Sequence, residues 1–336
     1  MEAPTKTLPQ AMLMAAGLGT RLLPFTGVVA KPLLPLMGVP MAQYAVDLLL
    51  AAGVRKIVAN VHHLPEATAL GLRGLELGEA SLEVSDESQL LLGSAGGIKK
   101  AAAHFGGKPF FLLNSDVVCD VDLAALYERH QFMRSYFGVR MTLAVFSEGP
   151  AGAKYSEIKL DERRGLIRSL GEKSEKKPFF VGVAVIEPEA LANVPESGPA
   201  EFVPSILEPA IRAGRAGVFM VDNTGETPDE RAWFDVGSPE LWHSTHLDLM
   251  RKLESGNISE LWRSRIEKEN LKLAPQLWVS RKSGLVDLPT GWEGPAYWSP
   301  EHGAAAPSSF GPNTVLYGAA SGSGPGIGFR GIWKDL

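Results

Sequence analysis

Met14-Ala15-Ala16-Gly17-Leu18-Gly19-Thr20-Arg21 is the stretch on which the interpretation of this 336-residue chain depends. It follows a short apolar segment, as a loop at the end of a buried strand does. Gly17 and Gly19 lack a Cβ, so the backbone can bend sharply and bring its N–H groups against an anion. Arg21 adds a planar guanidinium that suits a pair of phosphate oxygens, and Lys31 adds a second positive charge. We therefore predict a cradle for a triphosphate.

Two better-known phosphate loops do not match this stretch. A Rossmann fingerprint needs a third glycine where the chain has Leu22, and a Walker A loop needs Gly-Lys-Ser/Thr, which the sequence lacks. A glycine pair alone also occurs in ordinary tight turns that carry a surface arginine. The longer run is more specific, because it continues as Leu22-Leu23-Pro24-Phe25-Thr26 and then as Lys31-Pro32-Leu33-Leu34-Pro35.

The longer run resembles the signature of the sugar-1-phosphate nucleotidylyltransferases, also called nucleotide-sugar pyrophosphorylases. The resemblance covers residues 11–250 and is closest in its motifs to the mannose-1-phosphate guanylyltransferases. It implies that a sugar 1-phosphate reacts with a nucleoside triphosphate, GTP or UTP, to give a nucleotide sugar and pyrophosphate. It also implies that Arg21 and Lys31 are catalytic and that the nucleotide is bound by Ala15, Ala16, Gly17, Gly19 and Thr20.

Composition and charge narrow the class of protein. Apolar residues make up 45% and charged residues 21% of the chain, which is ordinary for a soluble globular protein. The net charge of −5 argues against a nucleic-acid partner, which would need an excess of Lys and Arg. The single cysteine, Cys119, excludes an internal disulfide, and no apolar run is long enough for a signal peptide or a membrane span. We expect a cytoplasmic protein.

Short apolar runs alternate with helical patterns up to about residue 146. Residues 56–61 and 110–114 are predicted as buried strands, and residues 41–52 and 122–132 as helices, the second capped by Asp122. This alternation predicts βαβ units, an α/β fold and a mainly parallel, Rossmann-like sheet. The resemblance implies the glycosyltransferase-A type of this architecture.

The pattern changes after residue 155. Residues 155–185 read as a small antiparallel insertion with charged turns at 161–164 and 172–177. Helices are expected at 202–213 and from Ser238-Pro239 onward, and strands at 216–221 and 233–236.

Asp116 directly follows the strand at 110–114, and a carboxylate there is a natural ligand for Mg²⁺. An aspartate after a strand is more often a cap or turn former. Asn114-Ser115-Asp116-Val117 and Trp233-Phe234-Asp235-Val236-Gly237 nevertheless resemble the two metal motifs of the family. The resemblance implies that Asp116 and Asp235 are catalytic and hold Mg²⁺ as the cofactor.

Leu92-Gly93-Ser94-Ala95-Gly96-Gly97-Ile98 precedes an expected helix at 99–105, and its small residues would let a base or sugar lie against the backbone. It resembles a glycine-rich loop of the family, which implies that Gly93 and a polar side chain just upstream, Glu87 or Gln89, bind the nucleotide. The alternative is a simple helix cap.

Glu172-Lys173 resembles the family's sugar-binding pair, which implies that both residues and Gly182 bind the sugar phosphate. By themselves they would read as a solvated turn. The family usually has Pro where this chain has Ser174 and Gly where it has Ser156, so the sugar is the least defined part of the prediction.

The tail after about residue 273 is rich in Gly, Pro, Ser and Trp, with apolar steps at about six-residue spacing. Residues 1–250 are therefore predicted as the catalytic domain and 251–336 as a C-terminal extension. Several members of the resembled family carry a left-handed hexapeptide β-helix there; the alternative is an irregular tail. We expect the extension to support a homodimer, with Trp278, Tyr297, Trp298 and Phe310 buried.

Three functions remain open at this stage. The Asn-Ser-Asp-Val strand favours a mannose-1-phosphate guanylyltransferase, and the Ala-Gly-Gly-Ile loop favours a uridylyltransferase such as the muramic-acid-1-phosphate enzyme. The third is a catalytically silent paralogue that binds nucleotide sugar as a regulator. Retention of the five residues assigned to catalysis and phosphate binding argues against it: Arg21, Lys31, Asp116, Lys173 and Asp235.

Overall fold

The computed structural model describes residues 8–148, 155–174, 177–221, 233–274, 277–280, 291–292, 296–299, 309–310, 314–317 and 331–333. After residue 273 it describes the burial of side chains only at Trp278, Ser280 and Tyr297. The chain forms two compact units. The first comprises Met1–Leu18 and Ala45–Trp233, and the second comprises Gly19–Tyr44 and Phe234–Leu336.

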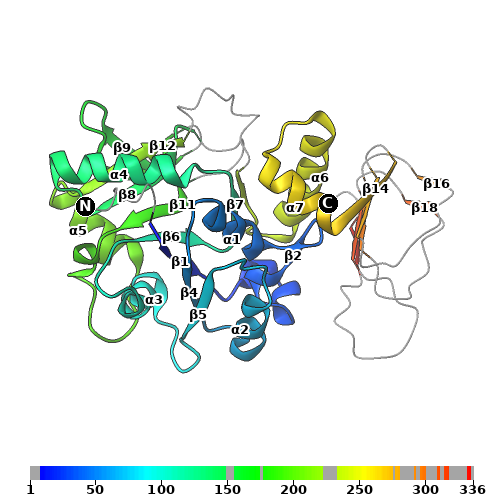
Figure 1. The fold of residues 1–336 in the computed structure, drawn as a ribbon, viewed down its shortest axis with the longest axis horizontal. Coiled ribbons are helices and arrows are strands. Elements are labelled where there is room, and N and C mark those ends of the chain that lie inside the picture. Colours follow the sequence, from blue (N-terminus) through cyan, green and yellow to red (C-terminus); the bar gives the residue numbers. More distant parts are fainter. Residues whose placement is uncertain are drawn as a thin grey trace. The chain divides into compact units, whose positions relative to one another are not determined.

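The first unit is built on one nine-stranded sheet. Its strands are β1 (Gln10–Met14), β4 (Lys56–Val61), β5 (Ser81–Asp86), β6 (Phe110–Asn114), β8 (Met141–Phe146), β9 (Tyr155–Asp161), β10 (Leu166–Ser174), β11 (Phe179–Ile186) and β12 (Ala216–Met220). They lie in the order β5-β4-β1-β6-β11-β8-β12-β10-β9 (Figure 1). The first four are parallel, as are β8 and β12, whereas β11, β10 and β9 run antiparallel to their neighbours. The predicted mainly parallel sheet with an antiparallel part is confirmed.

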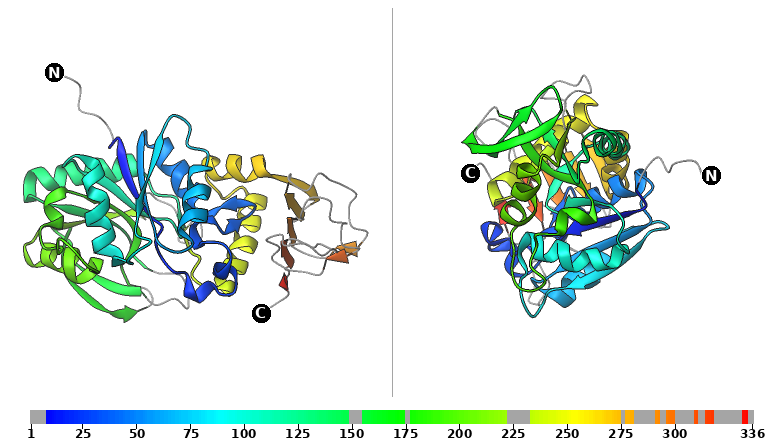
Figure 2. Two further views of the ribbon diagram at one scale, coloured as in Figure 1. Left: turned by 90° about the horizontal axis from the view of Figure 1, so that it is seen from below. Right: turned by 90° about the vertical axis from the view of Figure 1, so that its left-hand side faces the viewer.

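Helices cover both faces of this sheet, as Figure 1 and Figure 2 show. On one face α3 (Gly93–Ala102) and α5 (Glu208–Arg212) enclose an apolar core, which includes Leu112. On the other face, α4 (Leu123–Phe137) places Tyr127 with its ring 6.2 Å from that of Phe111. Successive side chains of a strand point to opposite faces, so the neighbours Phe111 and Leu112 meet different helices. The unit also contains α2 (Pro65–Arg73) and β7 (Val117–Cys119).

The helix α4 confirms one sequence prediction and extends it. Oδ1 of Asp122 accepts a hydrogen bond of 2.9 Å from the N–H of Ala125, which is the expected N-cap. The helix runs to Phe137, beyond the predicted end at residue 132, and closes with a left-handed Gly138. His130 helps to hold α4 in place. Its Nδ1 lies 2.9 Å from Thr142 Oγ1, and its Nε2 lies 2.9 Å from Glu187 Oε1.

The second unit packs aromatic side chains around a short hairpin, β2 (Pro35–Leu36) and β3 (Val39–Pro40). From α6 (Pro239–Ser255), Trp242 donates its Nε1–H to the carbonyl of Pro35 at 2.8 Å. From α7 (Glu260–Glu269), Trp262 is fully buried and meets the ring of Tyr44 edge-on. The expected Ser238 cap of α6 is present, because its Oγ accepts the N–H of Leu241 at 3.3 Å. Two further elements, the helix α1 (Met41–Ala51) and the strand β13 (Trp233–Asp235), each have residues in both units.

Among the described residues, burial strongly shifts the pKa of His246 and of Cys119. Burial lowers the pKa of His246 in α6 to about 3, and its Nδ1 lies 2.9 Å from the carbonyl oxygen of Trp242. Burial raises the pKa of the Cys119 thiol to about 12, and the neighbouring Asp120 adds to the shift. His246 is therefore neutral and Cys119 is a thiol near neutral pH.

The C-terminal strands pair in a repeating pattern. They are β14 (Asn270–Ala274), β15 (Leu277–Ser280), β16 (Gly291–Trp292), β17 (Ala296–Ser299), β18 (Ser309–Phe310), β19 (Thr314–Tyr317) and β20 (Gly331–Trp333). Strands β15, β17 and β19 are parallel neighbours, as are β16 and β18. Paired strands start about 18 residues apart, the length of three hexapeptides.

The hexapeptide β-helix and the boundary at residue 250 stay predictions about this region. Trp278 and Tyr297 are buried, with 3% and 0% of their surface exposed, as expected. The side chains of Trp298 and Phe310 lie outside the described part of the structure. Among the described residues, no helix is long and apolar enough to cross a bilayer.

Candidate active site

Ala15 and Ala16 begin the loop after β1 and are buried, whereas Gly17 is exposed. The N–H of Ala15 donates a hydrogen bond of 2.8 Å to Oδ1 of Asn60 in β4. A Cβ added at Gly17 would meet none of the described heavy atoms within 4 Å, its two chain neighbours aside. The Ala15 N–H is thus used inside the protein, and Gly17 is the accessible part of the predicted nucleotide loop in the first unit.

In the second unit, Gly19 and Lys31 lie side by side. Gly19 has φ +64°, and a Cβ there would come within 2.7 Å of Thr26 Cγ2 and 3.3 Å of Lys31 Cβ. The Thr26 hydroxyl also donates to the Gly19 carbonyl at 2.8 Å. Only glycine fits this left-handed turn without strain. The Lys31 side chain is 7% exposed, and its stem packs against the turn that the sequence assigned to phosphate binding.

Arg21 lies against the segment that contains the second predicted metal ligand. Thr20 and Arg21 are exposed on a 3₁₀ turn, Thr20–Leu22. The guanidinium group of Arg21 would stand 2.9 Å from a Cβ on Gly237, two residues after the half-buried Asp235. The second unit therefore contains five predicted catalytic or binding residues, Gly19, Thr20, Arg21, Lys31 and Asp235. Of these, Gly19 and Lys31 lie side by side, and Arg21 lies against Gly237.

Asp116 follows β6 in the first unit and is half-buried. The turn before it is fixed by Ser115, whose N–H and hydroxyl both donate to the carbonyl of Met14, at 3.2 Å and 2.5 Å. The predicted sugar-phosphate residue Gly182 lies nearby: it has φ +86°, and a Cβ there would be 3.0 Å from Asn114 Nδ2. The structure thus places the Asp116 turn next to Gly182.

The glycine-rich segment departs from the prediction. Helix α3 begins at Gly93, not after Ile98, so most of the expected loop is helical. The N–H groups of Ala95 and Gly96 donate to the carbonyl of Ala200, at 2.8 Å and 3.2 Å. A Cβ on Gly93 would lie 2.7 Å from the same carbonyl. These donors and this face of Gly93 meet the protein itself, which corrects the expectation that they lie open to a base or sugar.

Ser94 acts within the fold rather than toward a ligand. Its hydroxyl donates to Glu201 Oε2 at 2.6 Å and accepts the N–H of Phe202 at 2.7 Å. These bonds tie the start of α3 to Glu201 and Phe202, but the N-cap residue Leu92 makes no side-chain cap and Ser94 accepts no N–H of the helix, so the cap of the alternative interpretation is not formed by Ser94.

Glu87 is buried, with 2% of its surface exposed. Its Oε1 accepts from Asn60 Nδ2 at 2.7 Å, and its Oε2 accepts from the N–H of Leu92 at 3.1 Å. Its role in nucleotide binding stays a prediction. Asn60 was not predicted as a functional residue, although an asparagine inside the apolar strand at residues 56–61 is the kind of buried polar residue that needs a partner.

Glu172 and Lys173 are exposed and lie in strand β10, not in the expected turn. Lys173 pairs with Ser156 of β9, after an irregularity in the register that follows Leu170. Within the described part of the chain, neither side chain forms an ion pair. The pair is available to a ligand, and its assignment to sugar phosphate stays a prediction.

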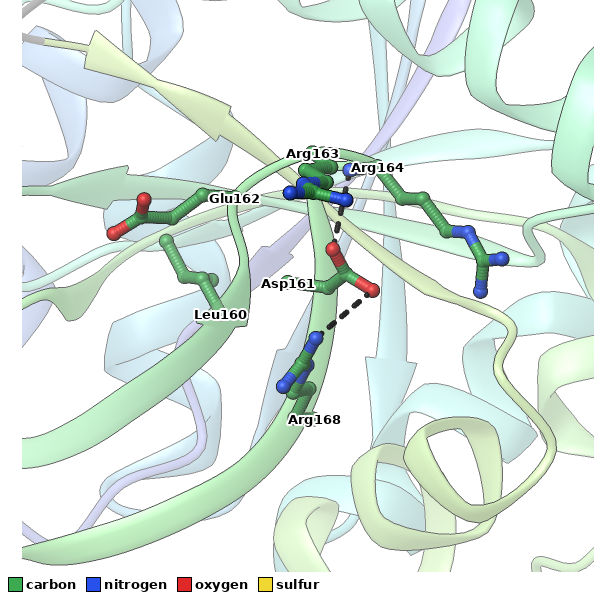
Figure 3. Close-up of a pocket in the computed structure, with 6 residues that line it drawn as sticks. All are labelled: Leu160, Asp161, Glu162, Arg163, Arg164 and Arg168. Carbon is green, nitrogen blue, oxygen red and sulfur yellow. Dashed lines mark hydrogen bonds and ion pairs between the residues drawn. The ribbon is translucent and has the colours of Figure 1, made fainter.

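A surface hollow of about 540 Å³ lies at the turn between β9 and β10 (Figure 3). Asp161 holds this turn, because its carboxylate pairs with Arg168 at 3.4 Å and accepts the N–H of Arg164. The lining contains none of the residues that the sequence assigned to binding or catalysis: Leu160, Asp161, Glu162, Arg163, Arg164 and Arg168.

A mainly parallel α/β sheet and a left-handed glycine turn near Arg21 and Lys31 are typical of proteins that bind nucleotides. The model of the family described as nucleotidyl transferase matches residues 10–252. The chain therefore belongs to the nucleotidyl transferase family and is a nucleotidyltransferase enzyme.

Curated relatives agree with this family. Mannose-1-phosphate guanylyltransferase 1 of Arabidopsis thaliana is 27% identical over 264 residues, covering 74% of this chain and 68% of the relative. Mannose-1-phosphate guanyltransferase of Kluyveromyces lactis is 28% identical, covering 81% and 73%. UTP–glucose-1-phosphate uridylyltransferase of Synechocystis is 26% identical, covering 74% and 66%.

Solved structures share the fold. HddC from Yersinia pseudotuberculosis superposes with a TM-score of 0.57 at 19% identity, covering 72% of this chain and 100% of that one. The inositol-1-phosphate CTP transferase from T. maritima gives a TM-score of 0.56 at 18% identity, covering 78% and 96%. HddC has also been solved in complex with GMP-PN.

Proposed function

We propose that the enzyme is a sugar-1-phosphate nucleotidylyltransferase that uses GTP and mannose 1-phosphate to form a GDP-sugar and pyrophosphate. The observation that carries the proposal is the turn at Gly19, which holds Lys31 at its side and precedes the exposed Arg21. Two cations beside a left-handed glycine suit a triphosphate. The names of the mannose-1-phosphate guanylyltransferase relatives support the choice of substrates.

In the proposed reaction, an oxygen of the sugar phosphate attacks the α-phosphorus of the nucleoside triphosphate. A new P–O bond forms as the bond to the bridging oxygen breaks, and pyrophosphate leaves. The attacking oxygen is already ionised at neutral pH, so the chain needs to supply no general base. Its work is to position the two substrates in line and to neutralise charge.

Each cationic side chain has a separate role in this scheme. Arg21 would bind the β- and γ-phosphates that leave, Lys31 would bind the triphosphate near its α-phosphorus, and Lys173 would bind the incoming sugar phosphate. Glu172 would accept hydrogen bonds from sugar hydroxyls. Arg21, Glu172 and Lys173 are exposed and are therefore open to direct contact with a ligand.

Mg²⁺ is the cofactor that we propose for this reaction. Asp116 and Asp235 would hold it: both are half-buried carboxylates at or just after the end of a strand, and carboxylate oxygens fit this hard cation. When bound, the ion would neutralise phosphate charge. Mg²⁺ takes only one or two protein carboxylates beside water and substrate oxygens, so two aspartates are a sufficient set.

A uridylyltransferase is the second candidate. The Synechocystis relative is named for UTP and glucose 1-phosphate, and it matches the same share of this chain as the Arabidopsis guanylyltransferase.

We propose that the enzyme works in the cytoplasm as a homodimer, with no nucleic-acid or membrane partner.

A pyrophosphate-release screen tests the function. The four common nucleoside triphosphates would each be combined with mannose, glucose and muramic-acid 1-phosphates in the presence of Mg²⁺, with Asp116→Asn as the inactive control. We expect the highest kcat/KM with GTP and mannose 1-phosphate. A preference for UTP would favour the uridylyltransferase. Release with no combination, together with tight binding of a nucleotide sugar, would favour a regulatory paralogue.

A further inference from the structure

Three hydrogen bonds connect the loop after β1 to the start of α3 through two buried side chains. The Ala15 N–H donates to Asn60 Oδ1 at 2.8 Å, and Asn60 Nδ2 donates to Glu87 Oε1 at 2.7 Å. Glu87 Oε2 then accepts the N–H of Leu92 at 3.1 Å. Asn60 and Glu87 are only 1% and 2% exposed, and all four residues belong to the first unit.

The direction of this chain of bonds is fixed by its two ends. A backbone N–H can only donate, so the Asn60 atom that faces Ala15 must be the amide oxygen. With the amide oxygen used in this way, the Asn60 atom that faces Glu87 must be the amide nitrogen, which donates. Asparagine supplies one acceptor and one donor at this distance, which no aspartate, serine or leucine does.

The surrounding structure leaves space for the pair and for little else. A Cβ on Gly97 would come within 2.6 Å of Glu87 Oε1 and 2.7 Å of Asn60 Nδ2. Gly97 lies inside α3, where alanine would be the better helix former. The glycine at this position is therefore explained by the buried pair, not by a ligand. The backbone of Glu87 is fixed as well, because its N–H donates to Val61 at 2.8 Å and its carbonyl oxygen lies 2.8 Å from His62 Nδ1.

We infer that Asn60 and Glu87 are positioning residues that hold the loop at Ala15–Gly17 and the segment at Leu92–Gly93 in one arrangement for the nucleoside triphosphate. The inference rests on the proposed function, because both ends of the hydrogen-bond chain are segments assigned to nucleotide binding. Neither side chain needs to touch the substrate. A partly satisfied buried network is costly, so breaking one link should loosen both ends.

Exchanging the two chemical groups provides a sharp test. Asn60→Asp keeps the acceptor for Ala15 but sets one carboxylate against another. Glu87→Gln keeps the size of the side chain but leaves an amide that cannot satisfy Asn60 and Leu92 together. In the double variant Asn60→Asp/Glu87→Gln, the glutamine can donate to the aspartate and still accept from Leu92. Both ends are restored, and the net charge equals that of the native pair.

The variants would be compared in the full-length protein by steady-state kinetics with GTP and mannose 1-phosphate, and by amide hydrogen exchange. Each single variant should raise the KM for the triphosphate roughly tenfold or more while leaving the KM for the sugar phosphate within about twofold. Exchange at Ala15 and Leu92 should become faster. The double variant should recover most of both losses, as coupled neighbours do.

Gln10→Met is the matched control. Gln10 is also buried and lies at the start of β1, the strand that ends just before Ala15, where its amide donates to the carbonyl of Pro109 at 3.0 Å. This variant should lower the melting temperature without changing either KM. If Asn60→Asp and Glu87→Gln behave in the same way, or if the double variant recovers nothing, the inference is wrong.

Two further outcomes are also decisive. If either single variant does not fold, Gly97→Ala carries the comparison, since its methyl group presses on the pair from α3 and should raise the KM for the triphosphate in the same way. If the native enzyme turns over no substrate pair, the proposed function fails. Amide hydrogen exchange at Ala15 and Leu92 then decides alone whether the loop at Ala15–Gly17 and the segment at Leu92–Gly93 are coupled.

Discussion

The guanidinium group of Arg21 lies against the backbone of Gly237, where an added Cβ would stand 2.9 Å from Nη1 and 3.1 Å from Nη2. Gly237 follows Asp235 by two residues, so within the second unit the arginine assigned to the leaving phosphates lies over the segment assigned to the metal. The absence of a side chain at residue 237 allows this contact.

Gly237→Ala is expected to displace Arg21 without unfolding the protein, because the clash falls on the far end of a flexible side chain. We expect kcat to fall by roughly tenfold or more, as when a charge that stabilises the transition state is misplaced. Steady-state kinetics would measure it. Gly27→Ala is the control, since a Cβ there meets only Leu23 at 3.8 Å.

Arg21→Ala should lower kcat more than it raises the KM for the sugar phosphate, and Gly237→Ala should add little on that background. Additive losses of kcat in the double variant Arg21→Ala/Gly237→Ala would show that Gly237 acts on something other than Arg21. An effect on the sugar-phosphate KM alone would remove Arg21 from the triphosphate site.

Asp116→Asn should lower kcat by on the order of a hundredfold or more, while the circular-dichroism spectrum and melting temperature stay close to native. Asp120→Asn is the matched control, because Asp120 is exposed a few residues further along the same segment and has no assigned role. A native kcat for Asp116→Asn with Mg²⁺ would remove Asp116 from the metal site.

Lys173→Ala should raise the KM for the sugar 1-phosphate by roughly tenfold or more and leave that for the nucleoside triphosphate nearly unchanged. Lys177→Ala is the control, because Lys177 is exposed and lies 3.9 Å from Glu157. An unchanged sugar-phosphate KM in Lys173→Ala would return Glu172 and Lys173 to an ordinary solvated strand.

Stability should depend on pH through His246. Its folded pKa of about 3 lies below the unfolded value, so the unfolded state binds the extra proton between these values. Its contribution is complete above about pH 6.5 and is lost on acidification, by ~1.4 kcal/mol per pH unit. Urea unfolding between about pH 7 and pH 5 should show a shallower loss in His246→Gln than in the native protein. Equal slopes would contradict the assignment.

The C-terminal strands are expected to support a homodimer. Stacked strands leave backbone groups open at the exposed end of the stack, and a second copy is the simplest cover. Light scattering should show a dimer for the full chain and a monomer after truncation at Ala274. This cut keeps α7, whose Trp262 packs on Tyr44. A monomeric full-length protein, or a dimeric truncated one, would refute this role.

The parts of the fold that local patterns determine were predictable. The strands at 56–61 and 110–114 begin and end where their apolar runs do, and Asp122 and Ser238 cap the helices that follow them. Propensity, alternation and capping all act within a few residues, so a sequence displays them directly.

The misplaced elements depend on distant partners. The first turn of α3 is stabilised by the carbonyl of Ala200, which accepts the N–H groups of Ala95 and Gly96, and no local signal in a glycine-rich run reveals that. Lys173 lies in a strand because Ser156 pairs with it. In the candidate site, the cations and carboxylates could be predicted from the sequence, but Asn60 could not. Its role depends on the two atoms that it connects, Ala15 N and Glu87 Oε1.

The buried Cys119 gives the molecule a practical property. Thiol reagents attack the thiolate, and a thiol with a pKa of about 12 inside the core supplies almost none near neutral pH. The native folded protein should therefore not react with maleimides. A cysteine introduced by Leu18→Cys, at a position 42% exposed in the loop, would become the single attachment point for a fluorophore. The unaltered protein would serve as its blank, and the dye would report nucleotide arrival in real time.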